Sequence, residues 1–304
     1  MEIYYENTDI TDMVQVRKCI VHDTAGKRCD SISIEFENAA GWRRWGPKED
    51  DRIIVVQSGY SSGQMYVNTV QEEEGHYRLF ATALPCKARQ KGCYAYINKT
   101  LEEVMRHCAA VSNMEYQIFG LDPNTVIPYM ERDHEGCAAF LSRFLMLEGA
   151  VLKCVNGKYT AIGLEYAQDI ANYQAIEVSL KQKGMQYSRN GNGIKKLTVS
   201  TPYAQASAED TAASKDWLSC TKYLPARNNI QAGRWARSLL LSANRMCETV
   251  YLQERFNSSR TAMTRLDISG YTDAAGEWLI EDVEHDLKDL RTSISMRRCI
   301  RTIR

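Results

Sequence analysis

The stretch MERDHEGCAAFLSRFLMLEGAVLKCVNGKYTAIGL, residues 130–164, decides the fold of this chain. Its first half predicts a helix, because apolar side chains recur at the spacing that places them on one helical face. These side chains are Cys137, Phe140, Leu141, Phe144 and Leu145. Asp133 is predicted to cap the helix by accepting a hydrogen bond from an early backbone N–H. Gly149, which tolerates a positive φ, is predicted to end it.

The second half of the stretch predicts a β-hairpin. Residues 150–155 and 158–164 flank Asn156-Gly157, and Asn-Gly between two apolar runs is a strong signal for a two-residue hairpin turn. No reactive group of residues occurs within residues 130–164. The helix and hairpin are therefore predicted to be scaffold.

The first 86 residues are predicted to form short strands. Residues 31–36, SISIEF, alternate polar and apolar side chains, which is typical of a strand with one buried face. The predicted strands are residues 12–21, 30–37, 52–57, 64–70 and 77–83. Strands that recur with turn residues between them indicate an antiparallel barrel or sandwich.

Residues 87–165 are predicted to form a small α+β domain. Thr100 and Glu103 have the spacing of a capping box. They precede a helical stripe made of Leu101, Val104, Met105 and Cys108. The helix and hairpin of residues 130–164 complete this domain.

Residues 166–304 are predicted to form a second β domain. Its expected strands are residues 176–180, 196–201, 265–269, 278–284 and 292–298. A long helix is expected at about residues 231–256, and residues 188–193 and 204–214 are expected to be loops, the latter a linker or lid. The fold class is therefore α+β, mainly β, with boundaries near residues 86 and 165.

Composition excludes several classes of protein. The 304 residues carry 38 basic and 38 acidic side chains, so the formal net charge is +0, whereas a general nucleic-acid binder needs a basic excess. The ten cysteines are scattered and form no CxxC pair, which favours reduced thiols. Neither a signal peptide nor an apolar run long enough to cross a bilayer occurs, so we expect synthesis in a cytosol.

The sequence contains no motif that predicts an enzyme. Phosphate-binding loops and HExxH are absent. His134 and Cys137 have helical spacing, but structural zinc needs four ligands. His285 lies between Glu284 and Asp286, two acidic neighbours that would raise its pKa, yet no nucleophile accompanies it. We therefore expect no catalytic residue, no cofactor and no metal, and interpret His285 as a structural strand residue.

A loop with the sequence AAGWRRWGP, residues 39–47, supplies the candidate interface. Its contact residues are Trp42, Arg43, Arg44 and Trp45. Tryptophan and arginine are favoured at protein–protein contacts, and packing under the first β domain is the alternative role. Stacking on nucleic-acid bases is a third interpretation, which the neutral chain disfavours.

Three segments, in order, resemble one known family. The central segment follows the pattern E-x-D…F-L-x-R…E-G through Glu131-Arg132-Asp133, Phe140-Leu141-Ser142-Arg143 and Leu147-Glu148-Gly149-Ala150. The outer segments are residues 30–36 with Trp42, Trp45, Pro47 and residues 51–53, and residues 276–280 with 283–286. The chain thus resembles the late control protein D family, the baseplate hubs of contractile phage tails. The hub part of type VI secretion spike proteins is related to that family.

The resemblance implies a structural protein, not an enzyme. Its two β domains would be antiparallel barrels like those of the tail tube, with the α+β domain between them. A homotrimer would present six barrels and adapt a hexameric tail tube or tube-initiator protein to a trimeric spike. The tape-measure protein and other baseplate proteins would be further partners, with no sequence-specific nucleic acid and no membrane span. The protein would reside in the baseplate of a virion or a DNA-free tail-like bacteriocin and leave the host on lysis.

Two alternative functions remain at this point. One is a cell-wall hydrolase acting at the tail tip, for which His285 would be the residue to test. The other is a type VI-like spike adaptor. The chain shows no β-helical needle repeats, so any needle would be a separate protein.

Overall fold

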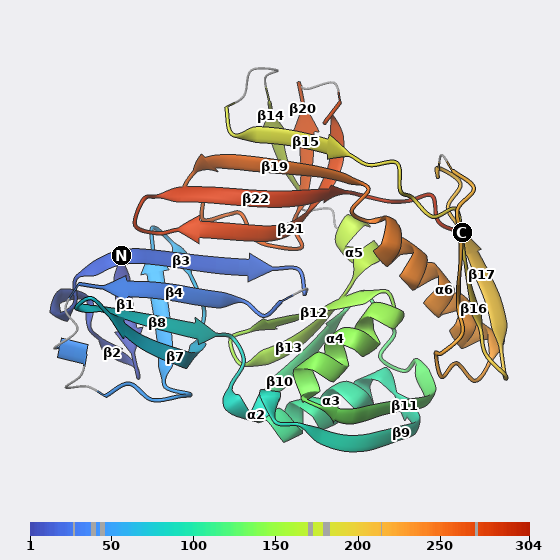
Figure 1. Ribbon diagram of the computed structural model, residues 1–304, viewed down its shortest axis with the longest axis horizontal. Coiled ribbons are helices and arrows are strands. Elements are labelled where there is room, and N and C mark those ends of the chain that lie inside the picture. The colour runs from blue at the N-terminus through green and yellow to red at the C-terminus, as the bar shows by residue number, and fades with distance from the viewer. Residues whose placement is uncertain are drawn as a thin grey trace.

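The computed structural model describes residues 1–26, 28–37, 41–42, 46–169, 173–178, 183–213, 215–270 and 273–304. The fold is α+β and mainly β, as the sequence predicts. Its main feature is a fourteen-stranded sheet that takes strands from both ends of the chain. A helical middle segment and a small peripheral unit pack beside this sheet (Figure 1). No helix among the described residues is long and apolar enough to cross a membrane.

The N-terminal part of the large sheet contains eight strands. They are β1 (Glu2–Tyr5), β2 (Thr8–Asp9), β3 (Val16–Thr24), β4 (Ser31–Phe36), β5 (Arg52–Gln57), β6 (Tyr60–Ser61), β7 (Met65–Glu73) and β8 (His76–Thr82), with a short 3-10 helix η1 (Thr11–Met13) after β2. Alternation holds in β4, where Ile32, Ile34 and Phe36 are buried. The five strands predicted for this part are confirmed, with shifted ends.

The C-terminal part of the sheet contains six strands. They are β14 (Tyr173–Glu177), β15 (Met185–Arg189), β19 (Glu248–Arg255), β20 (Arg265–Ser269), β21 (Gly276–Asp286) and β22 (Arg291–Arg298). Strand β21 pairs antiparallel with β3, so His285 lies opposite Val21 and Asp282 opposite Thr24. Figure 1 shows these two strands, from opposite ends of the chain, side by side.

The prediction of two closed barrels differs from the observed pairing. The strand order is β15-β19-β22-β21-β3-β4-β8-β7-β5-β1-β2, with β20 paired to β21, β14 to β20 and β6 to β5. Within the described ranges, this order closes neither half on itself. The edge of β3 that could have closed the N-terminal half is instead occupied by β21. The two halves are thus adjacent parts of one sheet.

The middle segment combines short sheets with helices. Its elements are α2 (Cys86–Arg89), β9 (Gly92–Thr100), α3 (Leu101–Ser112), β10 (Glu115–Phe119), β11 (Val126–Glu135), α4 (Cys137–Leu147), β12 (Ala150–Val155), β13 (Lys158–Gly163) and α5 (Leu164–Asp169). The capping box of α3 is confirmed, because the Thr100 and Glu103 side chains each accept a hydrogen bond from the other's backbone N–H. Asn156 and Gly157 both have positive φ, as the predicted hairpin turn requires.

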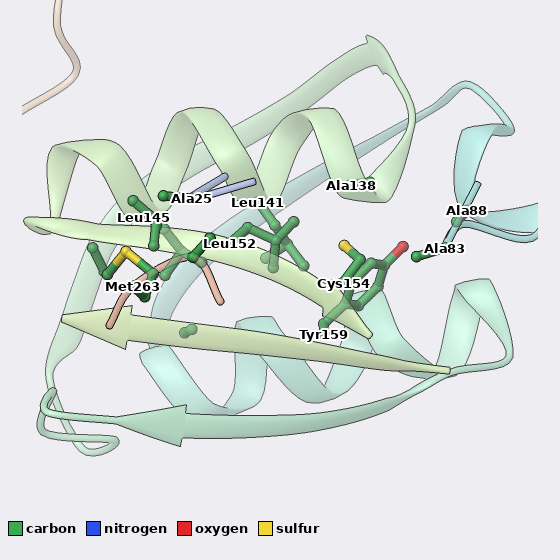
Figure 2. Close-up of a cluster of buried hydrophobic side chains, with 14 of the residues drawn as sticks. Ala25, Ala83, Ala88, Ala138, Leu141, Leu145, Leu152, Cys154, Tyr159 and Met263 are labelled. Atoms are coloured by element: carbon green, nitrogen blue, oxygen red, sulfur yellow. The ribbon is translucent and has the colours of Figure 1, made fainter. Parts of the chain in front are cut away.

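Helix α4 confirms the predicted buried stripe but corrects its cap. All five stripe residues are buried, and Figure 2 shows Leu141 and Leu145 of α4 facing Leu152 of β12. Asp133 lies in β11, and Gly136 is the N-cap residue, so the Asp133 cap is wrong. Strand β11 continues to Glu135 because it pairs with β9 up to that point.

Gly149 is confirmed at the end of α4, with φ +76°. It also permits a close approach, because a Cβ atom there would lie 2.9 Å from Ser238 Oγ on the neighbouring helix. The adjacent Glu148 accepts hydrogen bonds from Arg234 Nε (3.0 Å) and Trp235 Nε1 (2.8 Å) of that helix. The α4 terminus is therefore a docking point for α6.

The predicted helix at residues 231–256 is wrong in its second half. Helix α6 (Asn229–Asn244) ends at Asn244, and β19 follows. The buried Asn244 amide donates to Ile194 O and Asp210 Oδ2, both at 2.8 Å. This contact fixes the helix end, and the β-branched Thr249 and Val250 then favour the strand.

The stretch predicted as a linker or lid is instead partly a strand. Residues 204–214 contain β17 (Gln205–Glu209), which forms a three-stranded sheet with β16 (Lys196–Ser200) and β18 (Leu218–Thr221). Helix α6 packs on this sheet. The small side chains of Ala206 and Ala208, which suggested a linker, let the helix approach closely.

One hydrophobic core extends through all three parts of the chain. Figure 2 shows Ala25 of the N-terminal part and Met263 of the C-terminal part in the same cluster as Leu145 and Leu152. A second, smaller core lies under the C-terminal strands around Trp278 and Ile280. The helix and hairpin of residues 130–164 are therefore the packing centre of the chain.

Truncating the α4 stripe tests this role. Leu141 is fully buried, so Leu141→Ala should lower the free energy of unfolding by about 2–5 kcal/mol through lost burial and a cavity. Met146 is 39% exposed on the same helix, so Met146→Ala should change it by no more than about 0.5 kcal/mol. Urea unfolding followed by circular dichroism measures both. Equal effects of the two substitutions would contradict the role of α4 as packing centre.

Candidate functional site

The three parts of the chain meet at a buried lysine. Lys153 of β12 contacts the carboxylates of Asp23, at the end of β3, and Asp30, just before β4; its Nζ lies 2.9 Å from Asp30 Oδ2. The second Asp23 oxygen accepts a hydrogen bond from the backbone N–H of Ala262 at 3.2 Å. Asp23 thereby links the N-terminal sheet, the hairpin and the C-terminal part. We call Lys153, Asp23, Asp30 and Ala262 the three-way junction.

One lysine cannot neutralise two buried carboxylates, and the pKa values of Lys153 and Asp30 are shifted as a result. Burial alone would lower the pKa of Lys153, but Asp23 and Asp30 together raise it above its ordinary value. Burial raises the pKa of Asp30 to about 6, a shift that Lys153 opposes and Asp23 reinforces. Asp30 Oδ1 also accepts from Thr24 N at 2.9 Å, which orients the carboxyl group. The side chains of Lys153, Asp23 and Asp30 are 12%, 10% and 6% exposed, so the junction is largely closed to solvent.

His285 lies in the β3–β21 seam and is fully buried. Its Nε2 lies 3.1 Å from Arg260 O, which can only accept, so Nε2 carries the proton and Nδ1 accepts from the Thr292 hydroxyl at 3.0 Å. The Tyr60 ring packs against the imidazole with centroids 4.4 Å apart. His285 is thus a hydrogen-bonded, buried strand residue, as the sequence predicts.

The expected rise in the His285 pKa is wrong. Burial lowers the pKa of His285, because the charged imidazolium would lose its hydration. Glu284 and Asp286 are its neighbours in the chain, but successive strand side chains point to opposite faces, and Glu284 instead lies 3.8 Å from His22. The sequence neighbours therefore do not govern this histidine.

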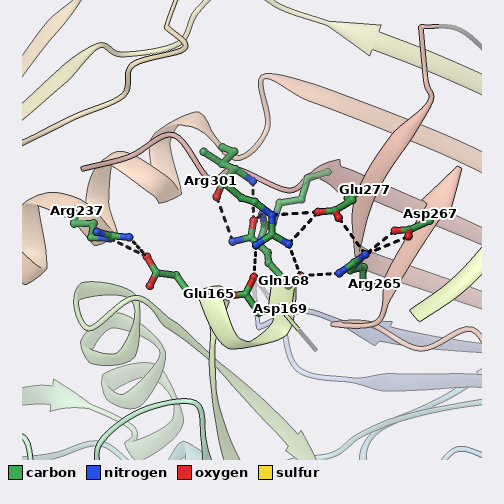
Figure 3. A network of polar contacts seen from close by, with 10 residues as sticks. Glu165, Gln168, Asp169, Arg237, Arg265, Asp267, Glu277 and Arg301 are labelled. Atoms are coloured by element: carbon green, nitrogen blue, oxygen red, sulfur yellow. Dashed lines mark hydrogen bonds and ion pairs between the residues drawn. The ribbon is translucent and has the colours of Figure 1, made fainter. Parts of the chain in front are cut away.

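A second polar network holds the C-terminal segment. Figure 3 shows Arg301 between α5 and β21: its Nη2 donates to Glu277 Oε2 and to Gln168 O, both at 2.9 Å, and its Nη1 contacts Asp169. Arg237 of α6 lies 2.6 Å from Glu165 of α5. The network ties the last residues and α6 to the end of the helical middle segment.

The structure places the first candidate interface residue in the core. Trp42 is 2% exposed and stacks on Tyr77 with centroids 5.5 Å apart, while Phe36 lies at 4.3 Å. Trp42 therefore packs under the sheet, which is the alternative role that the sequence left open, and the interface role of this loop stays a prediction. Arg43, Arg44 and Trp45 lie outside the described residues.

Large apolar side chains are exposed at one end of the peripheral sheet. Strands β16 and β18 run parallel, with Val199 opposite Thr221, so both end at the same edge. Just beyond lie Tyr203 and Tyr223, which are 65% and 97% exposed, and Ile230 in the first turn of α6 is 76% exposed. We call Tyr203, Tyr223 and Ile230 the apolar tip.

The apolar tip escaped the sequence analysis because its residues are far apart in the chain and follow no period. Thr201 Oγ1 donates to Ala226 O at 2.9 Å, which brings their loops together. The Arg227 guanidinium lies over the Tyr203 ring, 4.5 Å from its centroid, and extends the tip with a positive charge. Exposed tyrosine beside arginine is typical of protein–protein contacts.

Comparison with known proteins gives a consistent result for the fold. The tail protein from Neisseria meningitidis MC58 superposes with a TM-score of 0.77 at 9% identity, covering 98% of this chain and 95% of that one. The 43 kDa tail protein of prophage MuSo2 from Shewanella oneidensis gives 0.72 at 11% identity, covering 98% and 97%.

A type VI secretion component of E. coli, described as structurally similar to the T4 bacteriophage tail proteins gp27 and gp5, gives 0.59 at 10% identity and covers 93% and 73%. No family model matches the sequence, and no curated protein matches it. The fold of this chain is nevertheless the one shared by these phage tail proteins and the related type VI secretion component.

The three-way junction predicts a defined pH dependence. The Asp30 carboxyl holds its proton to about pH 6 in the folded state, against an ordinary pKa of 3.8. Between these values the folded state binds more protons than the unfolded state, so this group lowers the free energy of unfolding as the pH rises. Asp30→Asn removes the titration and keeps an acceptor for Thr24 N. The free energy of unfolding of Asp30→Asn, relative to that of the unsubstituted protein, should rise by up to roughly 3 kcal/mol between about pH 4 and pH 7.

Urea unfolding at several pH values measures this difference. Asp122→Asn, at an exposed carboxylate, is the matched control variant. A stability difference for Asp30→Asn that stays flat across the window would show that the carboxyl titrates normally.

Proposed function

We propose that this chain is the structural baseplate hub of a contractile tail. The observation that carries the proposal is the edge-to-edge union of two β units within one chain, through β3 and β21. The fold similarity to tail proteins over 98% of the chain supports it. A hub needs two equivalent sheet units held in a fixed relation, and the chain supplies that relation without a second subunit.

The proposed role solves a mismatch of symmetry. Closed assemblies need matched interfaces around a ring. Three copies of a chain with two β units present six units to a hexameric tube while keeping threefold symmetry for a trimeric spike. Within the described residues, β15 and β2 end the strand order and are paired on one side only. Such edges are available to a neighbouring chain, and ring closure would cover them.

The same proposal names the partners. The trimer would bind the tail tube or its initiator on one face, the spike on the other, and the tape-measure protein in its channel. Its place would be the baseplate of a phage or tail-like bacteriocin, made in the host cytoplasm and released on lysis. The apolar tip is available for one of these contacts, because isolated proteins seldom expose several large apolar side chains together.

A type VI-like spike adaptor is the second candidate. The likeness to the E. coli type VI secretion component favours it. A spike adaptor would have the same structural role as a baseplate hub. The two would differ in the spike protein that they bind. The cell-wall hydrolase gains no support, because His285 is buried and both of its ring nitrogens are engaged by Arg260 and Thr292.

Mass measurement tests the assembly. Co-expressed with its tube-initiator and spike partners, the chain should form a complex containing three copies of the 34.6 kDa polypeptide. Obligate interfaces bury about 2,000–5,000 Å², so this stoichiometry should persist at micromolar concentration. Native mass spectrometry counts the copies. A complex with a single copy, or no complex with either partner, would refute the hub assignment.

Charge on the apolar tip should weaken assembly without unfolding the chain. In the double variant Tyr223→Asp and Ile230→Asp, both side chains are exposed, so the free energy of unfolding should change by less than about 1 kcal/mol. The yield of the complex should fall at least tenfold, since a buried unpaired carboxylate opposes docking. Met13→Asp, 67% exposed elsewhere, is the control. An unchanged yield for the double variant would remove the tip from the interface.

A further inference from the structure

Three potential metal ligands converge on the surface of the β9–β11 pair. Cys93 Sγ of β9 lies 3.4 Å from His134 Nδ1 and 3.6 Å from Asp133 Oδ1, both in β11. His134 Nδ1 and Asp133 Oδ1 are 2.6 Å apart. All three residues are exposed, and one thiol, one imidazole and one carboxylate therefore share a single point in space.

A β-bulge creates this convergence. Arg132 pairs with Tyr94 and Glu135 pairs with Gly92, so Asp133 and His134 together oppose the single residue Cys93. In a regular strand, two successive side chains would point to opposite faces. The extra residue and the φ of +49° at His134 turn both side chains toward Cys93. A non-glycine residue at positive φ is uncommon, and such strain concentrates at functional sites.

The arrangement does not fit a Cys–His–Asp nucleophilic triad. In that triad the thiol and the carboxylate contact opposite nitrogens of the imidazole, so that the ring relays a proton between them. Here Cys93 and Asp133 both approach the same atom, His134 Nδ1. Three donor atoms grouped around one point suit an ion better than a proton relay.

The distances from Cys93 Sγ to the other two ligand atoms agree with tetrahedral zinc coordination. Zinc bonds of about 2.3 Å to sulfur and 2.0–2.1 Å to nitrogen or oxygen place sulfur roughly 3.5 Å from each other ligand atom, which matches 3.4 and 3.6 Å. Nitrogen and oxygen ligands are roughly 3.3 Å apart in this geometry, so the hydrogen bond between His134 and Asp133 would open by about 0.7 Å. Small rotations of two exposed side chains achieve this.

We propose that Cys93, Asp133 and His134 bind one Zn²⁺ ion, with water as the fourth ligand. Thiolate and imidazole favour zinc over the hard cations Mg²⁺ and Ca²⁺, which prefer oxygen ligands. The thiolate and the carboxylate together balance the ion's two positive charges. Three protein ligands and one water are the coordination of an open zinc site, and the ion would also hold β9 to β11 across the bulge, in a sheet that has only two strands. The proposal does not depend on the hub assignment.

Spacing along the chain pairs His134 only with Cys137, which is too few ligands to predict a metal site. The structure separates these two: Cys137 is buried and lies 2.6 Å from Arg132 Nη1, whereas His134 points outward. Cys93 is far away in the sequence, and only the strand register brings it to the bulge.

Metal titration of the full chain tests the site. The reduced protein, freed of metal with a chelator, is titrated with Co²⁺, which gives a thiolate charge-transfer band and strong visible absorption when tetrahedral. One equivalent should produce both signals, and Zn²⁺ should abolish them by displacement. Because the thiolate must be deprotonated, binding should weaken as the pH falls.

Variants assign the ligands. Cys93→Ser should remove the charge-transfer band, and Asp133→Asn and His134→Gln should each weaken binding by more than about tenfold. Cys220→Ser, at another exposed cysteine, should leave the titration unchanged. Circular dichroism confirms that each variant is folded. Absence of the band in the unsubstituted protein, or its persistence in Cys93→Ser, would overturn the proposal.

Discussion

The contact between Lys153 and the carboxylates of Asp23 and Asp30 is the constraint on which the rest of the structure depends. A buried ammonium is costly unless opposite charges surround it, so the β12–β13 hairpin has one allowed position against β3. Asp23 also binds Ala262 N, which sets the C-terminal part against the same strand end. The junction therefore determines how the three parts of the chain are arranged.

The seam between the two β units follows from this arrangement. Once the end of β3 is fixed, its free edge is available to β21, and Ala25 N donates to Glu281 O at 2.8 Å where the two strands meet. Buried His285 and its partners fill the space behind the seam. The hydrogen-bonded seam joins the two β units in one arrangement, and the proposed hub role requires such a fixed arrangement.

Local sequence patterns predicted part of this fold correctly. The α4 stripe, the Thr100 capping box and the Asn156-Gly157 turn depend on residues close together in the chain, and all three are confirmed. Errors arose where distant contacts override local preference. Asp133 looked like a helix cap because its pairing with β9 is invisible in sequence, and residues 245–256 looked helical because nothing in the sequence marks the buried Asn244 contacts that end α6.

The proposed interface and metal site were harder to predict, because they also depend on contacts between distant segments. Tryptophan is a residue type favoured at interfaces, but Trp42 is packed against Phe36 of β4 and Tyr77 of β8. The apolar tip and the Cys93 cluster are assembled from separate segments by strand register. The resemblance to tail hubs, by contrast, rested on three motifs in order, and the fold agrees with it.

Electron cryo-microscopy of the assembled tail tip tests the central claim most directly. The account predicts three copies of this chain around the tail axis, each contributing two β units to a ring of six beneath the tube. Six copies around the axis, or a position outside the ring, would contradict it.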